Sequence, residues 1–100
     1  MTQPQQAPPQ VKITVPNEVK PGVYCNLLLV SHTKEEFLMD FVLISPSEAI
    51  VTSRVIMSPG HMKRTVSALQ ENMKKYEQQF GKIKEAPEPV TKRKMGFVKP

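Results

Sequence analysis

Basic side chains gather where the sequence signals the start of a helix. Ser58-Pro59 is typical of such a start, because serine can cap free backbone N–H groups and proline at the first helical position gives up a donor that would be unpaired anyway. His61, Lys63 and Arg64 follow within the first turns, although the helix dipole disfavours cations there. A bound anion such as phosphate would account for these cations. The alternative is that the side chains extend into water at small cost.

Three polar residues, Asn26, Asp40 and Arg54, interrupt otherwise apolar segments. Each is expensive to bury without a partner, so each needs a hydrogen bond, an ion pair or a ligand. One interpretation is an internal Asp40 to Arg54 pair, with Asn26 satisfied by neighbouring backbone. The other is that Arg54 projects from the sheet toward an anionic partner.

The sequence lacks the motifs of the common enzyme classes. It contains no nucleophile elbow, Gly-rich phosphate loop, paired-carboxylate motif or zinc-ligand spacing. We expect His32 and His61 to be exposed polar residues. Cys25, the single cysteine, lies in an apolar run and is predicted to be a small buried hydrophobe. We therefore expect neither catalysis nor a metal or other cofactor.

Length and composition favour one domain. The chain has 100 residues, of which 39% are hydrophobic, enough for one modest core. A domain of this size has a thin margin of stability, and one helix cannot cover both faces of an apolar sheet. We therefore expect a homodimer.

The net charge of +5 is concentrated at the C-terminal end. Residues 84–100 hold five Lys or Arg against two Glu, which leaves this segment at +3, and the cluster Lys92, Arg93 and Lys94 lies within it. A basic tail favours contact with polyanions such as nucleic acid. The alternative is a tail that only aids solubility.

The N-terminal residues do not resemble a secretory signal. Residues 1–10 carry no positive charge and no apolar core, and nowhere does the chain reach the roughly 18 apolar residues that span a bilayer. We therefore expect a cytoplasmic protein that makes no membrane contact.

Apolar patterning predicts four strands. Residues 11–15 alternate apolar and polar positions, as a short half-buried strand does. Residues 23–30 and 37–44 are apolar almost throughout and are predicted to form a hairpin, and 48–57 is rich in β-branched residues. Residues 1–10, rich in Gln and Pro, are predicted to be disordered.

A long helix is predicted from Ser58-Pro59 to Phe80, with Gly81 as its terminating residue. Apolar residues recur in it at alternating spacings of four and three, and we expect this stripe to be the buried face. The stripe consists of Met62, Val66, Leu69, Met73, Tyr76 and Phe80. The expected fold is α+β, a four-stranded antiparallel meander followed by one C-terminal helix (ββββα), with a domain at 11–83 and a basic flexible tail at 84–100.

Short motifs are spread along the predicted strands and helix: Tyr24-Cys25-Asn26, Glu35-Glu36-Phe37, Asp40-Phe41, Ser53-Arg54-Val55, Met57-Ser58-Pro59, Lys63-Arg64, Asn72, Tyr76-Glu77 and Phe80-Gly81. With these motifs, the chain resembles a family of short bacterial and archaeal proteins described as a domain of unknown function. The resemblance covers residues 11–83 and implies no activity.

In element order, the expected fold is also similar to the single-stranded nucleic-acid-binding fold of the Whirly, Pur-alpha and positive-cofactor-four proteins. That similarity implies a dimer formed through the helices and single strands bound on the sheet. The chain departs from the pattern because its strands are more apolar, and it has only two Tyr and four Phe for base stacking.

Two functions follow as hypotheses. The first is a small non-enzymatic protein that binds nucleic acid, most simply single strands. Its expected binding residues are Tyr24, Arg54, His61, Lys63, Arg64, Lys92, Arg93 and Lys94. The second is a structural or adaptor protein whose exposed sheet face docks onto another protein.

Overall fold

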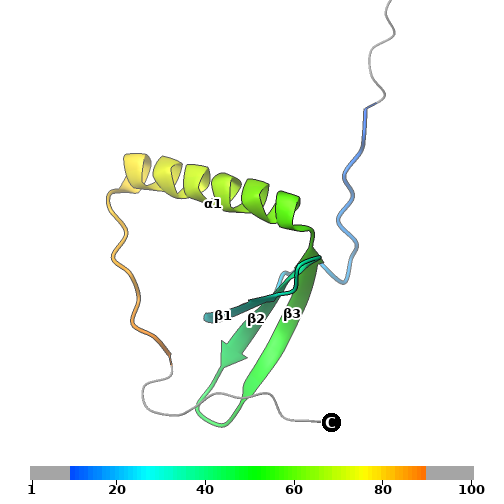
Figure 1. Ribbon diagram of the computed structural model, residues 1–100. Helices are drawn as coiled ribbons and strands as arrows, with labels where there is room; N and C mark the ends of the chain where they lie inside the picture. The colour runs from blue at the N-terminus through cyan, green and yellow to red at the C-terminus, as the bar shows by residue number, and fades with distance from the viewer. Residues whose placement is uncertain (1–9, 90–100) are drawn as a thin grey trace, which may run out of the picture.

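A three-stranded sheet followed by one long helix makes up the regular structure of the described part of the chain (Figure 1). The computed structural model describes residues 10–89. The strands are β1 (Leu27–His32), β2 (Phe37–Ile44) and β3 (Ala49–Met57), and the helix is α1 (Pro59–Phe80). The strands pair antiparallel in the order β1-β2-β3. The predicted α+β class and the antiparallel meander leading into a C-terminal helix are therefore confirmed.

The fourth strand, predicted at residues 11–15, is not found. This segment has no regular secondary structure and is exposed throughout. A turn follows it, in which the N–H groups of Val19 and Lys20 both donate to the carbonyl of Pro16. An alternating pattern favours a strand but supplies no neighbour, and here the chain turns before it reaches a sheet edge.

Strand β1 begins at Leu27 and not at Val23 as predicted, because the side chain of Asn26 ends the backbone hydrogen bonding between β1 and β2. That side chain donates to the carbonyl of Ile44 at 3.1 Å and accepts from the N–H of Ile44 at 2.9 Å. These are the backbone groups that a longer first strand would use. Tyr24 and Cys25 consequently precede the strand and are exposed, so the prediction of a buried Cys25 is wrong.

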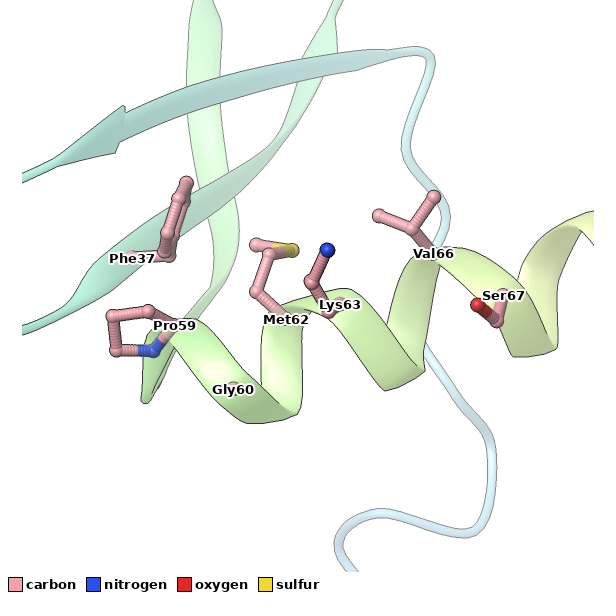
Figure 2. Close-up of a pocket in the computed structure, with 7 residues that line it drawn as sticks. All are labelled: Phe37, Pro59, Gly60, Met62, Lys63, Val66 and Ser67. Atoms are coloured by element: carbon pink, nitrogen blue, oxygen red, sulfur yellow. The ribbon is translucent and has the colours of Figure 1, made fainter.

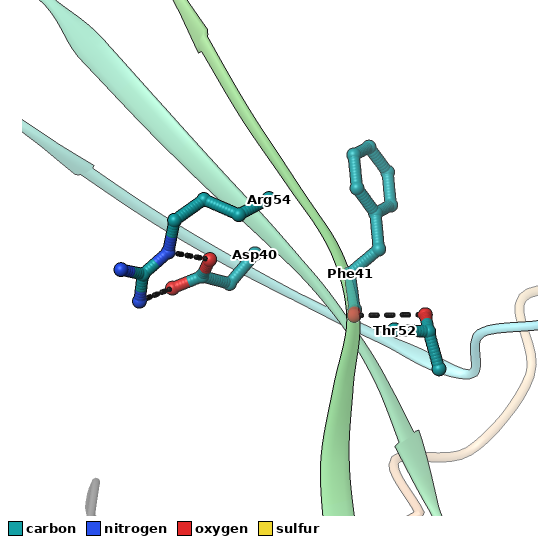
Figure 3. A network of polar contacts seen from close by, with 4 residues as sticks. All are labelled: Asp40, Phe41, Thr52 and Arg54. Atoms are coloured by element: carbon teal, nitrogen blue, oxygen red, sulfur yellow. Dashed lines mark hydrogen bonds and ion pairs between the residues drawn. The ribbon is translucent and has the colours of Figure 1, made fainter.

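A β-bulge in β3 disturbs the register. The pairing shifts between Phe41 and Val42, which leaves Thr52 as the extra residue. The Thr52 hydroxyl donates to the carbonyl of Phe41 at 3.0 Å (Figure 3). Side chains therefore keep to their faces on both sides of the bulge.

The register divides the sheet into two faces, because residues directly opposite in an antiparallel ladder share a face. We call the first the helix-side face, since α1 begins against it: the Thr65 hydroxyl lies 3.4 Å from the sulfur of Met57. It consists of Leu28, Val30, His32, Phe37, Met39, Phe41, Leu43, Ile50, Ser53, Val55 and Met57. The second, the open face, consists of Leu27, Leu29, Ser31, Leu38, Asp40, Val42, Ile44, Ala49, Val51, Arg54 and Ile56.

The helix has the predicted bounds and both predicted caps. The Ser58 hydroxyl accepts from the N–H of His61 at 3.2 Å. Gly81 has φ 97° and ψ 172°, a combination that only glycine adopts readily, and its N–H donates to the carbonyl of Glu77 at 2.9 Å. The backbone groups at both helix ends therefore find partners.

The apolar stripe of α1 is not buried within the chain, so that prediction is wrong for the single protomer. No residue of α1 is buried. From Val66 to Phe80 its members are 45% to 67% exposed. Only Ser58 separates β3 from α1, and the helix leaves the end of the sheet at an angle, so that its later turns extend away from the strands (Figure 1).

Replacing Ser58 by alanine should lower the free energy of unfolding by about 1 kcal/mol, because the N–H of His61 loses its acceptor. Urea denaturation followed by circular dichroism measures this. Ser67→Ala, in the exposed middle of the same helix, is the control and should leave the urea midpoint unchanged or slightly raised. Equal midpoints for Ser58→Ala and the wild type would contradict the capping role.

Candidate functional site

An ion pair between neighbouring strands lies at the centre of the open face. Arg54 Nε donates to Asp40 Oδ1 at 2.6 Å, and Arg54 Nη2 donates to Asp40 Oδ2 at 3.0 Å (Figure 3). The Asp40 side chain is only 2% exposed, whereas that of Arg54 is 53% exposed. The hydrogen bond to Asp40 and the charge of Asp40 raise the pKa of Arg54. Of the two interpretations that the sequence left open for Arg54, the pair with Asp40 is the one that the structure shows.

The pair fixes the direction of a half-exposed guanidinium. A guanidinium carries five N–H donors, and Asp40 engages two of those on Arg54, which leaves three. The bidentate geometry holds the planar group in one orientation. Arg54 can therefore still donate to an acceptor outside the chain.

Apolar side chains surround this cation. Leu29 lies directly across β2 from Arg54, in register with Asp40. Ile56 is 53% exposed and, with Leu38, forms the apolar part of a hollow of about 140 Å³ whose other walls are Ser31, His32, Thr33 and Glu36. The exposed apolar part of the open face lies on β3, where Val51 and Ile56 stand on either side of Arg54 along the strand, whereas Leu29 is half-buried and Val42 is buried.

Asn26 is satisfied in the way that the sequence predicted, through its two bonds to the backbone of Ile44. Together with the ion pair, this accounts for all three polar interruptions. None of them is left unpartnered, and among residues 10–89 no buried side-chain nitrogen or oxygen atom lacks a hydrogen-bond partner.

The three basic residues at the helix start form a second, separate group. Arg64 Nη2 lies 3.1 Å from Nδ1 of His61, and the first turn of α1 contains no acidic residue. Lys63 and Arg64 line a shallow surface hollow together with Ser67, Ala68 and Glu71. All three basic side chains are exposed.

The expected nucleic-acid residues do not all lie together. Arg54 belongs to the open face, whereas Lys63 and Arg64 lie on the helix that begins at the opposite face. Tyr24 is exposed in the segment before β1. Lys92, Arg93 and Lys94 lie outside the described residues.

A groove that sequence analysis did not identify lies between the sheet and the first turns of α1 (Figure 2). Its volume is about 590 Å³, and its apolar walls include Phe37, Met62 and Val66. Met62 and Val66 belong to the apolar stripe predicted from the sequence, but the spacing of the stripe could not show that Phe37 lies opposite them. Their meeting depends on the direction in which the helix leaves β3.

The structure gives no indication of a metal centre or a membrane span within residues 10–89. No group of three or more His, Cys, Asp or Glu side chains in that range could hold a metal ion. The helix α1 is too polar to cross a bilayer.

Comparison with known proteins assigns the chain to a family. The family model described as a protein of unknown function (DUF3467) matches residues 1–85. This is most of the chain, so the protein belongs to that family, in agreement with the resemblance seen in its motifs. None of the curated proteins and none of the solved structures compared with it gives a significant match.

Breaking the central ion pair from one side should destabilise the sheet. Arg54→Met leaves the carboxylate of Asp40 buried without its partner, whereas Asp40→Leu with Arg54→Leu removes both charges. In thermal unfolding, we expect the single variant to melt well below the wild type and the double variant to recover most of the loss. Arg64→Met is the control for the loss of one exposed arginine. If Arg54→Met and Arg64→Met had the same melting temperature, the ion pair would have no structural role.

Proposed function

We propose that this member of the DUF3467 family is a non-enzymatic docking protein that binds another protein through the open face of its sheet. The observation that carries the proposal is the combination found there. An apolar strand surface surrounds a guanidinium that Asp40 already orients and that keeps free donors.

The composition of the open face suits a protein partner. Arginine is enriched at the energetic centres of protein interfaces, where apolar contacts surround it. Because Asp40 holds Arg54 in place, less side-chain freedom is lost on binding. The chemistry calls for a partner with an apolar surface and a carboxylate or carbonyl oxygen placed to accept from Arg54.

The same composition argues against single strands bound on this face. A nucleic-acid platform combines several cations with aromatic rings on which bases stack. The open face has one cation, already paired, and no aromatic residue. Phe37 and Phe41 belong to the helix-side face.

The test compares two exposed edge-strand residues on opposite faces. Ile56 in β3 and Val30 in β1 are each 53% exposed, but only Ile56 belongs to the open face. Tagged protein is recovered from its native cells, and quantitative mass spectrometry measures the bound proteins. We expect a partner protein that the wild type and Val30→Lys both retain. The amount recovered with Ile56→Lys should be at least about tenfold lower, because this variant buries a charge against an apolar surface. Equal recovery with both variants, or no protein retained by the wild type, would contradict the proposal.

Nucleic-acid binding is a second candidate, favoured by one observation at the helix start. Three exposed basic residues stand at the positive end of α1 with no acidic residue in the first turn. Free backbone N–H groups and cations together favour a phosphate. On this proposal, the helix start and the basic C-terminal residues would bind, and the sheet would not.

Salt dependence tests the second candidate. Each phosphate neutralised on a single strand contributes about −0.7 to the slope of log K against log salt, so three or four contacts predict a slope of roughly −2 to −3. Fluorescence anisotropy with single-stranded DNA and RNA measures it. Arg64→Ala should weaken binding, whereas Lys75→Ala should have little effect because Lys75 lies 3.7 Å from Glu71. Binding abolished by alanine at Lys92, Arg93 and Lys94 but unchanged by Arg64→Ala would exclude the helix start.

A further inference from the structure

We propose that α1 pairs with α1 of a second copy of this chain, antiparallel and stripe against stripe, with Lys63 of each protomer opposite Glu77 of its partner. This surface is separate from the open face, so the inference goes beyond the proposed function. It concerns what covers the apolar side of the helix.

The helix carries an apolar seam that the described residues of its own chain leave largely uncovered. The stripe residues follow one another at spacings of 4, 3, 4, 3 and 4, the heptad spacing at which two helices pack side by side. Contacts with the sheet are found at the first turns, through Thr65 and the groove beside Phe37. The rest of the seam, from Leu69 to Phe80, is about 18 Å of helix at 1.5 Å per residue and has no partner within residues 10–89.

The order of side chains in the seam suits an antiparallel copy. The stripe is symmetric about Glu71, so a second helix running the opposite way places Met62 opposite Phe80. By the same symmetry, Val66 meets Tyr76, and Leu69 meets Met73. The two outer layers combine a smaller with a larger side chain and the inner layer combines two of similar size, which favours even packing. A parallel copy would instead set Val66 against Val66 and Phe80 against Phe80.

Charges beside the seam point the same way. In the heptad of the stripe, Lys63, Gln70 and Glu77 flank the seam on one side, and Thr65, Asn72 and Gln79 flank it on the other. In an antiparallel pair, the residues that flank the seam on one side of a helix meet the residues on the same side of its partner. Lys63 then meets Glu77 of the partner, Gln70 meets its own copy, and the other side is uncharged. Each dimer would contain two such ion pairs.

Both charged groups have capacity for this contact. Within residues 10–89, the ion pairs are Arg54 with Asp40 and Lys75 with Glu71, so Lys63 has none. Glu77 Oε2 accepts from the N–H of Ile83 at 2.8 Å, which orients the carboxylate and leaves Oε1 available. A parallel pair would also bring the two cationic helix starts together, whereas the antiparallel pair separates them and opposes the helix dipoles.

The first test is a charge exchange in the full chain, measured by sedimentation equilibrium at low salt. Lys63→Glu and Glu77→Lys should each raise the dimer dissociation constant about tenfold, because each turns two attractions into two repulsions. The double variant should return to within about threefold of wild type, even though Glu77→Lys also removes the bond to Ile83. Arg64→Glu and Glu71→Lys, on the outer side of the helix, are the controls and should leave the constant within about twofold.

The second test determines whether the two helices pair antiparallel. In a Cys25→Ser background, Gln70→Cys should form an intermolecular disulfide readily, since Gln70 meets its own copy across the antiparallel axis. Gln78→Cys, on the outer side of α1, should not. Equal cross-linking of the two would overturn the proposed orientation.

Three results would overturn the pairing itself: a monomeric wild type at 100 micromolar, flanking and outer charge variants with equal effects, or a double variant no better than its singles. These outcomes are distinguishable from failure of the docking function, because Ile56→Lys should leave the dimer intact. A monomer that still loses its partner with Ile56→Lys would retain the docking proposal and reject this one.

Discussion

The two ladders of β2 hold the tertiary structure of the protomer together. Within residues 10–89, the buried hydrophobic side chains are Met39 and Val42, and both belong to β2. Every other element depends on this strand: β1 and β3 pair with it on either side, and α1 begins where β3 ends. Backbone hydrogen bonds and a few central side chains therefore do what a wide hydrophobic core does in larger domains.

Because that centre is narrow, the ion pair within it constrains the open face strongly. Asp40 is the most deeply buried polar residue described, and Arg54 is the group that balances its charge. The pair also prevents the face from being uniformly apolar, since it fixes an exposed guanidinium among leucine and isoleucine side chains. The proposed docking role would thus share one residue with a structural role, because the Asp40-facing donors of Arg54 stabilise the fold while its others remain available.

The helix presents the opposite situation, because it is well formed by itself and poorly packed against its own chain. Ser58 and Gly81 satisfy its ends, yet within residues 10–89 its apolar stripe meets the sheet only at the first turns. Capping explains why the helix begins and ends where it does, but not what holds it in a fold. In a folded protein, most of the stability of a helix comes from packing of its apolar face against another surface. The exposed stripe, like the open face, therefore directs attention to association with other chains.

The sequence by itself determined the local features whose causes lie within a few residues. Ser58-Pro59 and Gly81 set the helix bounds, and the long apolar runs indicated two strands and much of a third. The cost of burying charge made a pair of Asp40 with Arg54 one of two interpretations, and the structure shows that pair. Tertiary structure decided the rest, because those outcomes depend on which segments meet. Residues 11–15 had a strand pattern but no edge to pair with, and the side chain of Asn26 occupied Ile44 and so left Cys25 outside the sheet. The direction of α1 likewise left its stripe exposed, since periodicity identifies an apolar face but does not supply the surface that covers it.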